Sequence, residues 1–536
     1  MKRSLIFFLV FLPSFLFAQN PKAVRLNPWM EVPGVDSMQT GAYVLGIKPS
    51  VNLPYRAAIS GWRKNSYEYD STRFYGLNSA TDTVPGLILS GGHPIIGDFN
   101  NDGFQDIAIV KQSGGYDTVY VYWGTPTGID ILDPLEIPAE ERNDHLQPMF
   151  AGDINNDGKE DLILTDPAFG NWRGKIYIFL NPVTKSAPDY VIVGDSVISS
   201  YWWYLGVNCS IADLNDDGYN DLVVRGERGE SSGDTAHYDY VNIYWGKGKS
   251  LLPDFDHPLQ IRSYYPTGGS LNWGLACFDV NGDGIPDLIW STLDSADQWI
   301  SIHFGGKNFS ATPNLRLKNP GVNNFGRTIA NAGDMNGRGY NDIVVGCPEA
   351  TYTAGFVCVY SGGRNVDTVY DAAVAVGGIQ VASYFGWSVS SVGDINGDGL
   401  SDIIVGAPWY TWTDDGGYWG IFLGDSAIPT AVKQHGTIPE EFKLNQNYPN
   451  PFNPSTAISY QLSMFSSVTL KIYDVLGREV KTLVDERENA GQHVVYWDGT
   501  NRHGRHVTSG VYFYRISVTT KDGKTLMQAK KISLVK

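Results

Sequence analysis

Hydrophobic positions along this chain fall in short runs of alternating apolar and polar residues, and no run continues with the period of a helix. Typical runs are Val119–Trp123, Lys175–Phe179 and Phe356–Tyr360, which are rich in β-branched and aromatic residues. Gly, Pro, Asn and Asp bound the runs, and these residues favour turns. Runs of this length and composition are typical of β-strands. The pattern therefore predicts an all-β protein.

Six of these strand-like runs follow a segment of Asp, Asn and Gly at nearly constant spacing. The segments begin at Asp98, Asp153, Asp213, Asp279, Asp334 and Asp394, at intervals of 55, 60, 66, 55 and 60 residues. A period of this size indicates a repeat architecture. Four strand-like runs per repeat describe the blade of a β-propeller. Residues 24–90 are one blade long but lack the polar segment, so we expect seven blades, with six as the alternative.

Each polar segment reads Asp-x-Asn-x-Asp-Gly-x-x-Asp, except that the fifth has Arg338 at position 5. Side-chain oxygens at positions 1, 3, 5 and 9, with a backbone carbonyl at position 7, suit Ca²⁺, which binds six to eight oxygens. An EF-hand is excluded because position 12 is apolar in every copy and the flanks are strand-like. The alternative is an Asx-rich turn without metal.

Five loops are therefore expected to bind calcium, in a role that is mainly structural. The predicted ligands, the position-7 residues acting through their carbonyls, are Asp98, Asn100, Asp102, Phe104, Asp106, Asp153, Asn155, Asp157, Lys159, Asp161, Asp213, Asn215, Asp217, Tyr219, Asp221, Asp279, Asn281, Asp283, Ile285, Asp287, Asp394, Asn396, Asp398, Leu400 and Asp402. The loop 334–342 is expected to be empty or weak, with the Arg338 guanidinium standing in for the metal charge.

Residues 85–424 resemble a known repeat family. The first strands open with aromatic-Gly pairs such as Phe325-Gly326 and Phe385-Gly386, the polar loop follows, and one repeat ends in Gly406-Ala407-Pro408. These features resemble the FG-GAP repeats of integrin alpha-chain propellers and their bacterial relatives. The resemblance implies a calcium-binding propeller that uses the face opposite the calcium loops for ligands.

The two ends of the chain differ from this repeat region. Lys2-Arg3, the apolar run Leu5–Phe17 and the small residue Ala18 are typical of a signal peptide over residues 1–18. The propeller is then expected over 19–427 and a linker over 428–442. No other apolar stretch approaches the length of a transmembrane helix. The sequence thus predicts an exported chain without a transmembrane segment in its mature form.

Residues 443–536 contain six further strand-like runs. These are 457–462, 468–473, 479–483, 493–497, 511–518 and 526–534, and their spacing predicts an immunoglobulin-like β-sandwich. Four stretches closely resemble the C-terminal sorting domains of the type IX secretion system: Tyr448–Pro454, Ile472–Arg478, Ser509–Tyr514 and Lys530–Lys536. The resemblance implies the type IX machinery as a partner, and a secreted or outer-membrane-surface protein of a Gram-negative, Bacteroidetes-like bacterium.

Charge and cysteine content exclude some functions. Residues 443–536 carry a net charge of +6, whereas the rest of the chain carries −23. An acidic body argues against nucleic acid as a partner. Four cysteines are too few for a disulfide scaffold, although Cys347 and Cys358, on consecutive predicted strands, could pair. His303 alternates within a strand and is expected to be packed rather than catalytic.

The aromatic residues outside the strands suggest a binding face. In an up-and-down blade, connections 2–3 and 4–1 emerge at the end opposite connection 1–2, which carries the calcium loops. The candidate ligand-binding residues in those connections are Trp172, Tyr201, Trp202, Trp203, Tyr204, Tyr264, Tyr265, Trp409, Tyr410 and Trp412. Flat aromatic rings suit contact with sugars or protein partners; the alternative is that they fill gaps between blades.

No catalytic motif is recognisable in the sequence, so we expect a binding or adhesion module for an unknown extracellular glycan or protein. The alternative is a secreted polysaccharide lyase or hydrolase built on the same scaffold.

Overall fold

The structure, a computed structural model, describes residues 24–535 with gaps. The gaps are 26–27, 34–37, 48–49, 51–55, 64–68, 78–84, 114–115, 141–145, 182, 195–200, 204, 231–236, 266–272, 295–296, 351–354, 367, 375–382, 409–416, 429–441, 448–449, 454, 463–465, 489–490, 504 and 521–524. The predicted signal peptide and nearly all of the predicted linker lie outside the described residues. The chain divides into two compact units, Met1–Val432 and Lys433–Lys536.

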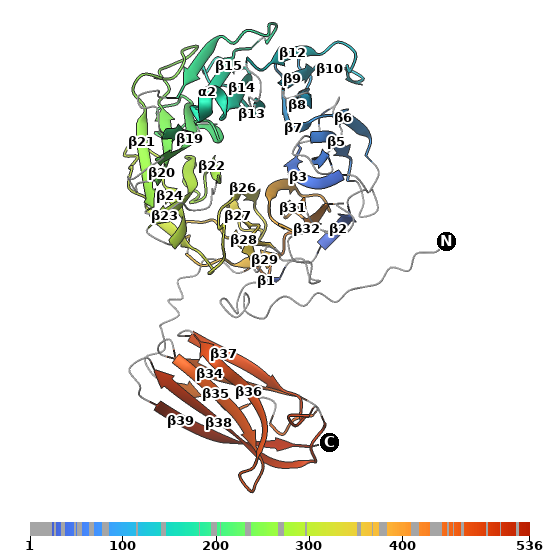
Figure 1. Ribbon diagram of the computed structural model, residues 1–536, viewed down its shortest axis with the longest axis vertical. Coiled ribbons are helices and arrows are strands. Elements are labelled where there is room, and N and C mark those ends of the chain that lie inside the picture. The colour runs from blue at the N-terminus through green and yellow to red at the C-terminus, as the bar shows by residue number, and fades with distance from the viewer. Residues whose placement is uncertain are drawn as a thin grey trace, which may run out of the picture. The chain divides into compact units, whose positions relative to one another are not determined.

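In the first unit the described strands form seven blades that follow one another around a ring, each with four antiparallel strands, and two of the blades carry an added fifth strand (Figure 1). The strands of each blade are given from innermost to outermost: blade one contains β3 (Met38–Gly46), β4 (Ala57–Arg63), β5 (Tyr69–Tyr75) and β6 (Leu87–Ser90), and blade two contains β7 (Gly92–Gly97), β8 (Asp106–Ser113), β9 (Tyr116–Tyr122) and β12 (Leu135–Pro138). Blade three contains β13 (Gln147–Gly152), β14 (Asp161–Asp166), β15 (Lys175–Phe179) and β16 (Tyr190–Val193), blade four contains β18 (Asn208–Ala212), β19 (Asp221–Glu230), β20 (His237–Tyr244) and β21 (Leu259–Tyr265), and blade five contains β22 (Leu275–Phe278), β23 (Asp287–Asp294), β24 (Asp297–His303) and β25 (Leu315–Lys318). Blade six contains β26 (Thr328–Gly333), β27 (Asp342–Cys347), β28 (Phe356–Tyr360) and β29 (Ala372–Val374), and blade seven contains β30 (Ser388–Gly393), β31 (Asp402–Ala407), β32 (Tyr418–Phe422) and β2 (Pro28–Pro33). The all-β prediction and the preference for seven blades are therefore confirmed.

Hydrophobic residues are buried between neighbouring blades rather than in one central core. The second strands β14, β27 and β31 are buried along their whole length, because each of their faces packs against a different blade. One cluster contains Val44 and Ile59 of blade one together with Ile404 and Trp419 of blade seven. Blade one therefore packs on blade seven, and the ring closes.

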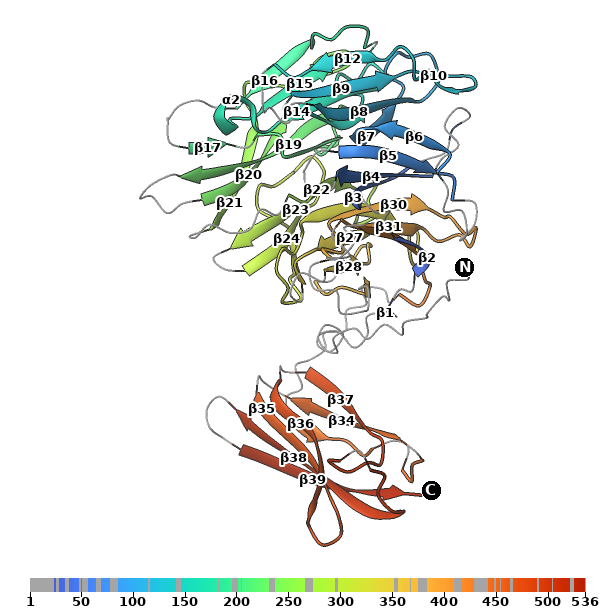
Figure 2. The same cartoon turned by 45° about the vertical axis from the view of Figure 1, so that its right-hand side comes forward.

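The N-terminal segment completes the last blade. Strand β2 is the outermost strand of blade seven, where Val32 pairs with Trp419 of β32 (Figure 2). The short strand β1 (Val24–Arg25) pairs in parallel with β29 of blade six. The sequence interpretation that placed residues 24–90 in one blade is thus wrong for 24–33, because these strands pair with residues far away in the sequence.

Deleting residues 24–33 should lower the melting temperature of the propeller. Without β2, the edge of β32 loses its backbone hydrogen-bond partners, and exposed strand edges also promote association between chains. Thermal unfolding followed by circular dichroism would measure the effect. Deletion of the two-residue strand β1 alone is the milder control. An unchanged melting temperature after removal of both strands would contradict the role given to β2.

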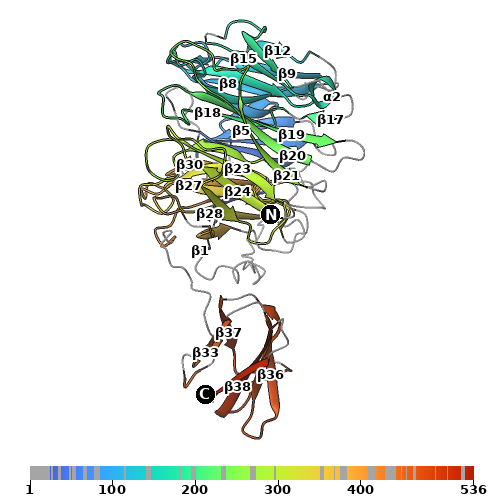
Figure 3. The same ribbon diagram turned by 90° about the vertical axis from the view of Figure 1, so that its left-hand side faces the viewer.

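The second unit is a β-sandwich of two antiparallel sheets (Figure 3). One sheet contains β33 (Lys443–Leu444), β34 (Thr456–Leu462) and β37 (Gly491–Trp497), and the other contains β35 (Ser466–Tyr473), β36 (Glu479–Glu488), β38 (Gly510–Thr520) and β39 (Thr525–Leu534). Alternate residues of β35 and β38 point into a core that surrounds Trp497. Burial of this alternating set explains why the strand pattern was visible in the sequence.

Candidate metal loops and the opposite loop face

The six polar loops all connect the first strand of a blade to its second strand, so they emerge at one end of the ring. Position 4 of each loop has a positive φ, between 58° and 80°, and is occupied by Asn, Asp or Gly. Position 6 has a φ between 81° and 92° and is always Gly. A Cβ atom on Gly103 would meet nothing within 4 Å, so its backbone conformation and not crowding requires glycine there.

Replacing Gly103 with Ala should therefore destabilise the propeller by about 1–2 kcal/mol, the cost of a left-handed conformation for a residue with a Cβ. Asn101→Gly in the same loop should change the free energy of unfolding much less, because later copies carry glycine at position 4 with the same φ. Chemical denaturation of both variants checks this. Equal destabilisation by the two changes would show that the conformational argument is wrong.

Side-chain oxygens in the loops are turned inward by hydrogen bonds to the loop's own backbone. In the loop 98–106, Asp98 Oδ1 and Asn100 Oδ1 both accept from the N–H of Asp102, at 3.0 Å each, and Asp98 Oδ2 accepts from Gly103 at 2.9 Å. Asp102 Oδ1 accepts from the N–H of Phe104 at 2.9 Å. The loops 153–161, 213–221 and 394–402 repeat this pattern. Positions 1, 3 and 5 are therefore brought together in each loop.

The Asp at position 9 connects the loop to its blade. Asp106 Oδ2 accepts from the N–H of Phe99 at 2.8 Å, and Asp106 Oδ1 accepts from Gly124, after the third strand, at 2.6 Å. The equivalent two bonds are present in all six copies. Burial raises the pKa of Asp106 and of Asp161 to about 7, and the neighbouring loop carboxylates add to the shift. Each loop thus holds a buried carboxyl group beside others of like charge.

The loops combine closely spaced carboxylates with further oxygen donors. A divalent cation would offset the repulsion among carboxylates, and the oxygen donors are of the kind that Ca²⁺ prefers. The residues present therefore fit calcium by chemistry. Within the described parts of the chain, however, no group of three or more His, Cys, Asp or Glu is arranged to hold a metal ion. The metal ligands named from the sequence stay predictions.

The loop 334–342 has the same backbone course but a different side-chain arrangement. Arg338 is exposed and makes no ion pair with the described residues, and the expectation that its guanidinium stands in for a metal charge stays a prediction. Asn336 donates to Asp342 at 3.3 Å and to Ser361 at 3.1 Å instead of to position 5. Arginine offers no acceptor to the Asn336 amide, but Asn281 also donates to its position-9 residue, Asp287, at 3.3 Å in a loop that keeps its position-5 Asp.

Neighbouring loops are also linked to one another. The amide of Asn220, at position 8 of one loop, donates to the backbone oxygen of Asp153 in the preceding loop at 2.8 Å, and Asn341 reaches Asp279 in the same way at 2.9 Å. Asn181, after the third strand of blade three, donates to the backbone oxygen of Asp98 at 2.7 Å. The loops therefore form a connected set at this end of the ring.

The opposite end of the ring carries the predicted aromatic residues. Tyr201–Trp203 form strand β17, which pairs with the projecting end of β19 (Figure 2). Tyr264 and Tyr265 end β21, so these two lie in a strand and not in the 4–1 connection where the sequence interpretation placed them. Trp172 ends the helical turn α2 (Phe169–Trp172) between the second and third strands of blade three. Four further candidates lie outside the described residues, namely Tyr204, Trp409, Tyr410 and Trp412.

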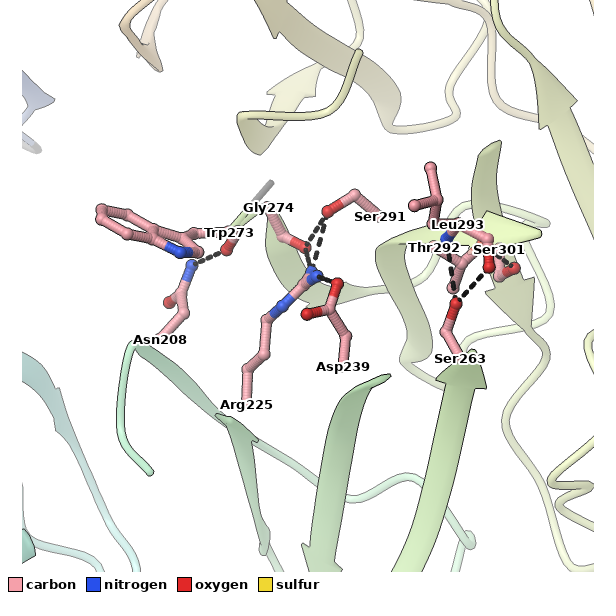
Figure 4. Close-up of polar contacts among 10 residues, drawn as sticks. All are labelled: Asn208, Arg225, Asp239, Ser263, Trp273, Gly274, Ser291, Thr292, Leu293 and Ser301. Carbon is pink, nitrogen blue, oxygen red and sulfur yellow. Dashed lines mark hydrogen bonds and ion pairs between the residues drawn. The ribbon is translucent and has the colours of Figure 1, made fainter. Parts of the chain in front are cut away.

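The arginine of a buried ion pair within blade four also forms hydrogen bonds with blade five near this end (Figure 4). Arg225 is 1% exposed, and it donates to Asp239 at 2.8 Å, to the backbone oxygen of Gly274 at 2.7 Å and to Ser291 Oγ at 2.8 Å. Burial raises the pKa of Asp239, whereas Arg225 lowers it. The sequence showed a strand at this position but gave no indication that its arginine would be buried.

A second arginine lies close to the rings of two tryptophans. The Arg327 guanidinium is 3.8 Å from the ring centre of Trp273 and 4.4 Å from that of Trp387. These residues belong to blades five, six and seven, and each stands beside the glycine of an aromatic-Gly opener. A glycine next to each residue is the one signal in the sequence that the three share.

Two smaller expectations can now be decided. Cys347 and Cys358 are both free, because the register sets Cys358 opposite Val345 and Cys347 opposite Phe356, so the suggested disulfide is wrong. His303 is packed as expected: its Nε2 accepts from Trp290 Nε1 at 3.1 Å, and burial lowers its pKa.

The fold is a β-propeller, and three stretches of it match FG-GAP-type repeats. Residues 98–164 and 213–290 match the FG-GAP-like repeat, and residues 385–418 match the FG-GAP repeat. In the second unit, residues 452–524 match the FlgD Ig-like domain. The sequence resemblance to FG-GAP repeats is confirmed for these residues.

Several animal proteins are similar to the propeller. Integrin alpha-5 of Xenopus laevis is 26% identical over 290 residues, which cover 49% of this chain and 26% of that protein. Integrin alpha-IIb of Mus musculus is 28% identical over 215 residues, covering 35% and 20%. Phosphatidylinositol-glycan-specific phospholipase D of Homo sapiens is 30% identical over 229 residues, covering 39% and 26%. The chain thus spans about a quarter or less of these relatives. No helix among the described residues is long and apolar enough to cross a membrane.

Proposed function

We propose that this protein is an extracellular, calcium-stabilised propeller that binds a glycan or a protein and does not act as an enzyme. The proposal rests on two sets of residues that lie at opposite ends of the ring. Six oxygen-rich loops lie at one end, and aromatic residues on an extended part of blade four lie at the other. Similarity to integrin alpha chains supports an adhesion-type role.

Calcium would be held by the Asp and Asn side chains at positions 1, 3, 5 and 9 of five loops, with the position-7 carbonyl. It would supply positive charge that lets several carboxylates share one loop. Bound calcium would thereby order each loop. The hydrogen bonds of Asn220 and Asn341 to the preceding loops would connect the ordered loops of neighbouring blades.

Glycan and protein arrays probed with the propeller unit would test the proposal. We expect Trp202→Ala and Tyr265→Ala to weaken binding to the ligand that the array identifies. Leu132→Ala is the control, because Leu132 is exposed near the loop end of blade two. Incubation with polysaccharides should release no products. New reducing ends or unsaturated sugars would instead identify a polysaccharide-degrading enzyme.

We further propose that the second unit is an export address read by the type IX secretion machinery of a Gram-negative, Bacteroidetes-like bacterium. Its separate core and its charge of +6, against −23 for the rest of the chain, support independent folding. The motifs quoted above support the sorting role.

A chain that ends near Gly436 should therefore fold and remain in the periplasm of its host. A reporter carrying the signal peptide and residues 437–536 should reach the outer-membrane surface or the medium. Cell fractionation with immunoblotting measures both. Normal secretion of the truncated chain would show that the second unit is not the address.

A further inference from the structure

The hairpin between β35 and β36 of the sandwich exposes two apolar side chains at its turn. Val475 and Leu476 are 65% and 73% exposed. The polar groups of the turn are bonded within it: Asp474 Oδ1 accepts from the N–H of Leu476 at 3.0 Å and of Arg478 at 2.9 Å, and the Asp474 backbone oxygen accepts from Gly477 at 3.0 Å. Asp474 Oδ2 also accepts from Arg478 Nε at 2.8 Å. The turn therefore presents an apolar pair on a backbone whose hydrogen bonds are already made.

Further apolar residues lie at the same end of the sandwich. Tyr473, the last residue of β35, pairs with Phe513, and the first residue of β38 pairs with Leu534, so the start of β38 and the end of β39 lie beside the hairpin. Val511 and Val535 are both exposed there. Single exposed apolar residues are ordinary on a surface, whereas a group of them at one end indicates an interaction site. We call this group, with residues 474–478, the hairpin end.

The loop between β37 and β38 adds positive charge to the hairpin end. The N–H of Arg502 donates to the backbone oxygen of Val480, near the start of β36, at 2.9 Å, which holds the loop beside the hairpin. The side chains of Arg502 and Arg505 are exposed, and neither forms an ion pair with the described residues. Arg502 Nε donates to His503 Nε2 at 3.2 Å. Two arginines of one loop are thus available to an anionic partner.

The acidic residues described at the hairpin end do not cancel these charges. Each of them already forms an ion pair with another basic residue, namely Asp474 with Arg478 at 2.8 Å, Glu479 with Lys471 at 2.9 Å and Asp498 with Lys481 at 3.0 Å. The charges of Arg502 and Arg505 are therefore in excess at this end, in keeping with the net charge of +6 over residues 443–536.

Apolar side chains beside excess positive charge match the surface of an anionic membrane. Apolar residues enter the boundary between headgroups and acyl chains, and basic residues attract anionic headgroups. A turn whose polar groups are bonded internally loses little when water is removed from it. The negative charge of the propeller does not prevent such contact, because at physiological ionic strength charges more than about 8 Å away are largely screened.

We propose that the hairpin end of the sandwich binds a membrane surface that carries anionic lipid headgroups. Val475 and Leu476 enter the acyl-chain boundary, and Arg502 and Arg505 contact the headgroup phosphates. This inference goes beyond the proposed function, because neither the ligand-binding face of the propeller nor the export role requires the sandwich to bind lipid.

Flotation of the full chain with lipid vesicles tests the proposal. Vesicles of phosphatidylcholine alone are compared with an equal mixture of phosphatidylcholine and phosphatidylglycerol, in buffer without added calcium. The chain should bind the mixed vesicles at least about tenfold more tightly than the neutral ones, as expected when two arginines contact the headgroups.

The apolar contribution is tested with Val475→Ser combined with Leu476→Ser. This variant should bind the mixed vesicles at least about tenfold more weakly than the unmodified chain, because two apolar side chains no longer leave water. Met527→Ser is the matched control. Met527 is 64% exposed on the same sheet, but it lies near the start of β39 and so at the opposite end of the sandwich. The control should bind normally.

The electrostatic contribution is tested with Arg502→Gln combined with Arg505→Gln. This variant should lose at least about tenfold in affinity for the mixed vesicles and should bind neutral vesicles like the unmodified chain. Lys443→Gln is the control, since Lys443 is exposed and pairs with Gln461, near the far end of β34. It should bind both kinds of vesicle normally.

Three results would overturn the inference. These are absence of binding to the mixed vesicles, equal affinity for mixed and neutral vesicles, and full affinity in the serine variant. The third result would mean that charge alone attracts the chain and that nothing enters the membrane. None of the three affects the binding of glycan or protein by the propeller, or the export of the truncated chain, so the proposed function is tested separately.

Discussion

Chelation of divalent cations is expected to lower the melting temperature of the propeller unit substantially. Ions that bind the folded loops and not the unfolded chain stabilise the fold by mass action, by about 2.7 kcal/mol for each site at a free concentration one hundred times its dissociation constant. With five intact loops, this is the largest effect of any single treatment. Differential scanning calorimetry with calcium and with a chelator would measure it.

Single loops should contribute unequally to that effect. Asp157→Ala removes a position-5 carboxylate from an intact loop, so it should lower the melting temperature in calcium more than Arg338→Ala. With chelator present, the difference between the two variants should shrink. Quantitative metal analysis that finds no tightly bound calcium in the untreated protein would contradict the metal assignment.

Arg225→Met is expected to be among the most damaging single substitutions, at about 3–5 kcal/mol, the usual cost of breaking a buried ion pair from one side. The change leaves the Asp239 carboxylate buried without its cation, and it removes the donor to Gly274 and Ser291. Equilibrium denaturation of the propeller unit measures the loss.

The double variant Arg225→Met with Asp239→Asn provides the control. It removes the uncompensated charge, so it should be more stable than Arg225→Met alone. Lys185→Met breaks an exposed ion pair with Asp189 and should have little effect. A loss in Arg225→Met no greater than that in Lys185→Met would show that the buried pair does not stabilise the blade interface.

Local chemistry explains what the sequence could predict. The loop 98–106 was recognisable because positions 4 and 6 must tolerate a positive φ, and Asn101 and Gly103 are residue types that do. The strands of the sandwich were recognisable because alternate residues, such as Ile472 and Tyr514, are buried. Each of these features is decided by neighbours close in the chain.

Contacts between distant segments explain what the sequence could not predict. Arg225, within β19, and Arg327, just before β26, look like ordinary polar residues, and neighbouring blades supply part of their surroundings. Charge balance in a loop does not fix where a long side chain such as that of Arg338 extends, so its role stays a prediction. Val32 and Trp419 pair only because the ring brings the two ends of the unit together.

The pairing of β2 with β32 also imposes an order on assembly. During synthesis, β2 emerges before any of the seven blades exists, and its partner β32 is the last described strand of the propeller to follow. The early strand must therefore wait unpaired while the intervening blades form, and contacts of such high sequence separation form slowly. Until that final pairing, both edges of the incomplete ring are open to strands from other chains. Ring closure is thus the step at which productive folding and association between chains compete.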